Sequence, residues 1–101
     1  MNSKTAKLII YGVTKEGRKF RPSDWAQRLT TAVATHGPGR RIIFHPKVRM
    51  ATLEGINCVV IETDLEETDP MLYRFLVAFG EENNLELTHT DVFPPVKTAT
   101  V

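Results

Sequence analysis

The segment Ile56-Asn-Cys-Val-Val-Ile-Glu62 predicts a β-strand more clearly than any other part of the sequence. β-Branched residues dominate it, and such residues pack well on a pleated sheet. The pair Glu54-Gly55 directly before it is suited to a tight turn, and the preceding residues Val48 to Leu53 continue as an extended segment. These three segments together predict a β-hairpin in the second half of the chain.

This strand has apolar side chains on both of its faces. Cys58 and Val60 lie on one side, while Val59 and Ile61 lie on the other, and the apolar run from Leu8 to Val13 has the same two-sided pattern. An antiparallel strand with one solvated face alternates apolar with polar residues. We therefore expect a cover on the second face of the sheet. The candidates are the tail Val92-Phe93-Pro94-Pro95-Val96, a second subunit or a ligand.

Two segments are expected to form helices. Pro22-Ser23-Asp24 opens the first, with Ser23 as N-cap, and Gly37-Pro38-Gly39 ends it. The second runs from Pro70, behind Asp69 as N-cap, to about residue 83, and a left-handed Asn84 ends it. The expected buried faces are Trp25, Leu29, Ala32 and Val33 in the first helix, and Leu72, Phe75, Leu76 and Phe79 in the second.

The remaining expected strands are Lys7 to Val13, Arg18 to Arg21, Arg40 to His45 and Leu85 to His89. The resulting order, ββαββαβ, predicts an α+β fold. We expect a two-layer sandwich, with a largely antiparallel sheet and two helices on one face, in a ferredoxin-like variant with an added N-terminal hairpin strand. Residues 1–89 are expected to form a single domain, and residues 90–101 an extended or disordered C-terminal tail.

Composition and motifs favour a non-enzymatic protein in the cytoplasm. The single cysteine, Cys58, cannot form an internal disulfide, and the residues before Tyr11 hold only a three-residue apolar run, far short of a signal peptide. No apolar stretch approaches the ~20 residues that span a bilayer. Histidines and the cysteine lack metal-ligand spacing, and no glycine-rich phosphate loop is present. We expect no catalytic residue, metal or cofactor.

The run Gly17-Arg-Lys-Phe-Arg-Pro-Ser-Asp-Trp-Ala-Gln-Arg-Leu29 resembles the signature of a family of short proteobacterial proteins known as a domain of unknown function. The strand segment 56–62 and Asp69-Pro-Met-Leu-Tyr-Arg-Phe-Leu76 match its later segments, so the resemblance covers roughly residues 8–88. It implies a bacterial origin and a shared fold, and no activity.

Charge is distributed unevenly along the chain. Eleven of the thirteen Lys and Arg residues lie before residue 51, and ten of the twelve Asp and Glu residues lie after it. A helix N-terminus flanked by arginines favours an anion. The candidate anion site consists of Arg18, Arg21, Ser23, Arg40 and Arg41. The alternative is that these cations pair with the acidic residues of the segment from Glu62 to Asp69, within one chain or across a dimer.

The second helix has more apolar surface than one buried face requires, which makes Tyr73 and Val77 candidate interface residues. The leading hypothesis is a non-catalytic interaction or regulatory module that acts as a homodimer or binds another protein. The alternative is an anion-binding protein for a phosphorylated ligand or nucleic acid. Nucleic acid is the weaker form of that alternative, because few aromatic residues lie between the cations.

Overall fold

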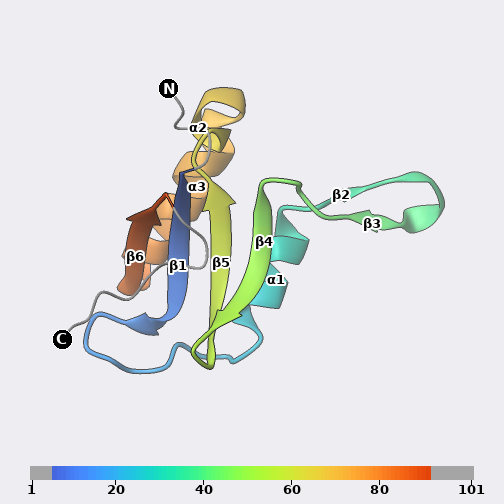
Figure 1. Ribbon diagram of the computed structural model, residues 1–101. Helices are drawn as coiled ribbons and strands as arrows, with labels where there is room; N and C mark the ends of the chain where they lie inside the picture. The colour runs from blue at the N-terminus through green and yellow to red at the C-terminus, as the bar shows by residue number, and fades with distance from the viewer. Residues whose placement is uncertain (1–5, 92–101) are drawn as a thin grey trace.

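The computed structural model describes residues 6–91, apart from the side chains of His36 and Arg40. A four-stranded sheet forms the body, and each neighbouring pair of strands is antiparallel. In spatial order the strands are β4 (Val48–Leu53), β5 (Ile56–Glu62), β1 (Lys7–Thr14) and β6 (Leu85–Thr90) (Figure 1). The predicted mixture of helices with an antiparallel sheet is confirmed at this level.

The turn between β4 and β5 is as tight as the sequence predicts. Glu54 and Gly55 both have positive φ, 53° and 79°. Two consecutive positive φ values are typical of a type I′ turn, whose twist matches that of the strands it joins. The register therefore continues without a shift from Leu53 opposite Ile56 to Val48 opposite Ile61.

Three α-helices lie within the described residues: α1 (Trp25–Ala32), α2 (Leu65–Thr68) and α3 (Pro70–Glu82). The start of α3 is as predicted, because the Asp69 side chain accepts a hydrogen bond of 3.2 Å from the backbone N–H of Leu72. Its predicted end is also confirmed, since Asn84 has a φ of 59°. The short helix α2 lies within the acidic segment from Glu62 to Asp69, for which the sequence analysis predicts no helix.

The segment between α1 and β4 forms an arm, defined here as residues 35–44. Its strands β2 (Thr35–His36) and β3 (Ile42–Ile43) pair only with each other, and the 3₁₀ turn η2 (Pro38–Arg40) joins them. The arm extends away from the body (Figure 1). The predicted strand from Arg40 to His45 is therefore mostly wrong: its strand part is confined to Ile42–Ile43 and does not join the main sheet.

The predicted hairpin strand from Arg18 to Arg21 is also wrong. The segment makes a single β-bridge, between Val13 and Lys19, and so the order ββαββαβ does not hold. The physical reason is that β5 and β6 already occupy both edges of β1 along most of its length. Only the end of β1 is open, where Phe20 donates a backbone hydrogen bond to Gly12.

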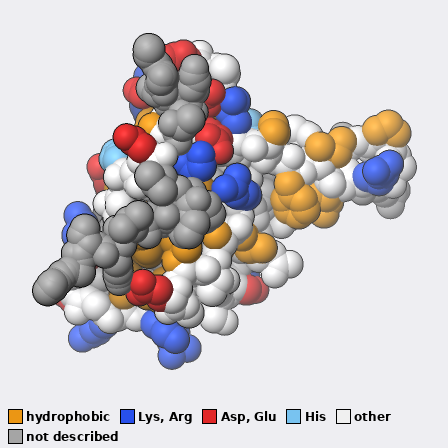
Figure 2. All heavy atoms as spheres, in the orientation of Figure 1, with side chains coloured by type: hydrophobic (Ala, Val, Ile, Leu, Met, Phe, Trp, Pro, Cys, Tyr) orange, Lys and Arg blue, Asp and Glu red, His pale blue; other side chains and the backbone are white. Residues whose placement is uncertain are grey.

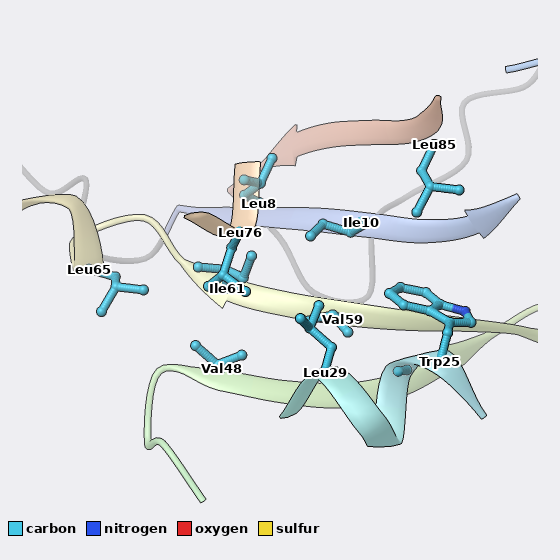
Figure 3. Packing of buried hydrophobic residues seen from close by; sticks show 11 residues of the cluster. Leu8, Ile10, Trp25, Leu29, Val48, Val59, Ile61, Leu65, Leu76 and Leu85 are labelled. Carbon is cyan, nitrogen blue, oxygen red and sulfur yellow. The ribbon is translucent and has the colours of Figure 1, made fainter. Parts of the chain in front are cut away.

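Buried apolar residues form two clusters, as the two-sided strand pattern predicts. The larger cluster combines strand residues such as Ile10 and Ile61 with Trp25 and Leu29 of α1 and Leu76 of α3 (Figure 3). The smaller consists of the strand residues Ile9, Cys58 and Val60. The predicted tail segment, which was one candidate cover for this second face, lies outside the described residues.

An aromatic group joins the two longer helices to the end of β1. The Trp25 ring stacks on Phe79, with centroids 5.9 Å apart, and Phe20 contacts both rings edge-on. Two predicted core positions are wrong, because Phe75 of α3 is 50% exposed and Ala32 of α1 is exposed.

Candidate functional site

The predicted N-cap of α1 is not the one that the structure uses. Asp24 occupies the N-cap position, and its side chain makes no capping hydrogen bond. Its carboxylate instead accepts a hydrogen bond of 3.1 Å from Arg28 Nε. Ser23 contributes its carbonyl oxygen, which accepts a bond of 2.9 Å from Asn57 Nδ2 of β5. This bond ties the segment before α1 to the sheet.

The residues of the predicted anion site occupy two separate places. Arg18, Arg21 and Ser23 are exposed in the segment that leads from β1 into α1. Arg41 is exposed on the arm, which extends away from that segment (Figure 1), and the side chain of Arg40 is not described. The structure therefore does not bring Arg41 together with Arg18 and Arg21.

Some of the basic and acidic residues pair within the chain. Lys47 Nζ lies 3.1 Å from the Asp64 carboxylate, and Glu62 contacts both Lys7, at 3.3 Å, and Arg49, at 3.8 Å. These side chains are partly exposed, and such pairs contribute little to stability. Among the described residues, the ion pairs do not include the three described cations of the predicted anion site, Arg18, Arg21 and Arg41.

A groove lies between α1 and the edge strand β4, with a volume of about 440 Å³. Ala26 and Gln27 line it from the helix, and Met50 and Thr52 line it from the strand. A smaller hollow of about 80 Å³ lies next to it and shares the lining residues Ser23 and Asn57. The sequence analysis missed this groove. The available signal was Met50, a large apolar residue two positions after the core residue Val48 and therefore on the same face of the strand.

Several large apolar side chains remain exposed. Ile42, Ile43 and Phe44, at the end of the arm's second strand, are 47%, 48% and 54% exposed, and Met50 on β4 is 50% exposed. Apolar side chains gather on and beside the arm in the space-filling view (Figure 2). On α3, Met71 and Phe75 are exposed, whereas the predicted interface residues Tyr73 and Val77 are partly buried against the larger core cluster.

Two side chains that can lose a proton, Cys58 and Tyr73, have raised pKa values. Burial raises the pKa of the Cys58 thiol to about 11, which disfavours the reactive thiolate. Burial, with a smaller contribution from Glu66, also raises the pKa of Tyr73. Among the residues described here, His, Cys, Asp and Glu form no group of three or more suited to a metal ion. No helix of the described part is long and apolar enough to cross a membrane.

Comparison with known proteins identifies the family. Residues 4–90 match the family described as "Protein of unknown function (DUF3579)". The chain belongs to the DUF3579 family. A solved structure described as a solution structure and the first structural representative of its family shares 32% sequence identity, with a TM-score of 0.79. The match covers 84% of this chain and 79% of that chain. No curated protein matches.

Proposed function

We propose that the protein is a non-catalytic interaction or regulatory module that acts as a homodimer. The observation that carries this proposal is the run Ile42, Ile43 and Phe44, in which three consecutive apolar side chains are each about half exposed. The run lies where the arm joins β4, so a partner that contacts it also meets the edge of the sheet.

Burial of the exposed run of the arm supplies part of the free energy that association requires. Fully burying an Ile or Phe side chain contributes about 1.5 to 3 kcal/mol, so covering these three half-exposed side chains contributes about 2 to 4 kcal/mol per copy. A symmetric dimer covers two arms, and association costs about 4 to 15 kcal/mol in lost freedom. The arm alone therefore supports a weak dimer at most, and a stable one needs additional surface.

Sedimentation velocity at micromolar concentrations tests the proposal. We expect a species of twice the chain mass, and we expect Ile43→Glu combined with Phe44→Glu to weaken it. Met71→Glu combined with Phe75→Glu is the matched control, since it places the same two charges on exposed apolar positions of α3. Tyr73→Glu and Val77→Glu, at the interface positions that the sequence favoured, test α3 instead. A wild-type protein that stays monomeric at high concentration contradicts the homodimer.

The second candidate function is anion binding at the start of α1, for a phosphorylated ligand or nucleic acid. It is favoured by the exposed Arg18, Lys19 and Arg21 beside a helix whose N-cap side chain, that of Asp24, makes no capping bond. NMR titration with inorganic phosphate at low salt tests it. Shifts of the backbone amides of residues 23–26 that Arg18→Ala with Arg21→Ala removes support it, and unperturbed amides contradict it.

Two finer features complete the proposal. The first is a ferredoxin-like variant of the fold, which is supported by the strand order β4-β5-β1-β6 and by a core cluster that includes residues of both α1 and α3. The second is a cytoplasmic location, which is supported by a single cysteine, Cys58, buried as a free thiol.

A further inference from the structure

The outer edge of β4 is open. β4 pairs with β5 on one side, and no other strand of residues 6–91 pairs with its opposite side. It runs for six residues, from Val48 to Leu53, without proline or a shift in register. Proteins usually protect such an edge with a bulge, a proline or a covering segment, because its free backbone groups can bind another strand.

The register identifies the residues that present these groups. Glu62 donates its backbone N–H to the carbonyl of Lys47 at 2.9 Å, so Lys47 is hydrogen-bonded toward β5. Hydrogen-bonding direction alternates along an antiparallel strand. Met50 and Thr52 therefore direct both backbone groups away from β5. Val48 directs its carbonyl outward as well, but its N–H donates to His45 at 3.2 Å.

The groove lies beside these outward groups. The side chains of Met50 and Thr52 lie on the same face as Val48, which belongs to the core cluster that includes residues of α1. Ala26 and Gln27 of α1 form the opposite wall. An edge strand next to a helix-lined groove is the arrangement that proteins use to bind an added strand, with backbone bonds for affinity and a groove for side chains.

We propose that β4 of one copy adds antiparallel to β4 of a second copy, with Met50 at the two-fold axis. The inference rests on the proposed homodimer and names its surface. At this register Met50 of each copy exchanges backbone hydrogen bonds with Met50 of the other, and the outward carbonyl of Val48 meets the outward N–H of Thr52. The Met50 side chains enter the grooves beside the joined strands.

A second copy suits this edge better than an unrelated strand for two reasons. The two-fold contact uses the same surface on both copies, so it closes the β4 edge of each copy and stops at a dimer. In addition, the arm leaves the body beside this edge (Figure 1), and the half-exposed run of residues 42–44 precedes β4 directly. The exposed apolar side chains of the arm therefore lie close to the same contact as Met50.

Proline substitution tests the backbone bonds without removing the sheet. Met50→Pro deletes an N–H that points away from β5, which an edge strand tolerates. We expect this variant to keep its circular dichroism spectrum and to raise the dimer dissociation constant at least tenfold in sedimentation equilibrium. Met50→Leu is the matched control, because it keeps the backbone donor and an apolar side chain of similar size, and it should dimerise like the wild type.

Crosslinking tests the register independently of any folding defect. Residues opposite each other in a hydrogen-bonded pair have Cα atoms about 5.5 Å apart, within the range of a disulfide. Met50→Cys should therefore form a covalent dimer rapidly under mild oxidation. Glu86→Cys, at an exposed position on the other edge strand, β6, is the control and should remain largely monomeric on denaturing gels.

The outcomes separate this inference from the proposed function. A dimeric wild type in which Met50→Cys crosslinks no faster than Glu86→Cys overturns the β4 contact and leaves the homodimer standing, with its interface on the arm alone or on α3. A folded Met50→Pro variant that dimerises like the wild type also overturns the β4 contact and leaves the homodimer standing. A wild type that is monomeric at high concentration overturns both, and the edge then remains for a strand of a different protein.

Discussion

The body and the arm use similar apolar residues in opposite ways. In the body, Trp25 and Leu76 are 4% and 0% exposed, whereas Ile43 and Phe44 of the arm are about half exposed. The body closes its core with helices on the sheet, while the two short strands of the arm pair only with each other. An isolated two-stranded hairpin is marginal in water. The comparison therefore suggests that the apolar residues of the arm serve association and those of the body serve folding.

The largest expected effect tests this comparison directly. Trp25→Ala removes a ring that packs on Phe20 and Phe79, and such truncations typically cost about 3 to 5 kcal/mol. That is a large share of the ~5 to 15 kcal/mol that stabilises a domain of this size. Phe44→Ala is the matched truncation in the arm, and we expect it to cost less than about 1 kcal/mol in the monomer because the ring is 54% exposed.

Urea unfolding at a concentration where the protein is monomeric measures both variants. Equal losses for Trp25→Ala and Phe44→Ala would mean that the arm belongs to the core. A loss under about 1 kcal/mol for Trp25→Ala would contradict its place at the centre of the aromatic group, since a buried tryptophan costs more than that to truncate.

A smaller effect is expected at the N-termini of α3 and α1. Asp69 caps α3 by accepting from Leu72, whereas Asp24 makes no capping bond. Asp69→Ala should therefore cost about 0.5 to 2 kcal/mol, typical of a lost N-cap. Asp24→Ala should cost at most about 0.5 kcal/mol, because it removes only an exposed pair with Arg28. Thermal unfolding of the two variants measures this difference, and equal losses would contradict it.

The same contrast explains how far the sequence could predict the fold. β1, β4, β5, β6 and α3 were predictable because strand composition, the Glu54-Gly55 turn and the Asp69-Pro70 cap are local signals. The segment from Arg18 to Arg21 was not, because its pairing depends on which edges of β1 the distant strands β5 and β6 occupy. Which strands pair with β1 depends on the whole sheet, so a local sequence pattern cannot predict it.

The candidate site depends on tertiary arrangement in the same way. The individual cations were identifiable from the sequence, but whether Arg41 lies near Arg18 depends on the direction of the arm. The groove was missed because it forms between α1 and β4, elements that are separated along the chain by the whole arm. The exposure of Phe75 has a similar origin. Helical periodicity predicts which side of α3 faces the core, but how many residues of that side are buried depends on the elements packed against it.

The last expected effect depends on pH. It concerns the smaller core cluster, which consists of Ile9, Cys58 and Val60. Burial raises the pKa of Cys58 from its ordinary value of 9.0 to about 11, so the folded state holds the thiol proton more tightly than the unfolded state. The resulting stabilisation is fully present below pH 9.0 and is lost as pH rises toward 11.

Between about pH 9 and pH 10, the free energy of unfolding should fall by about 1 kcal/mol more in the wild type than in Cys58→Ala. Urea unfolding at both pH values, with Cys58→Ala as the control for all other titrating groups, measures the difference. Identical pH dependence in the two proteins would show that Cys58 is solvated in the native state, and the smaller core cluster would then be less completely covered than the larger one.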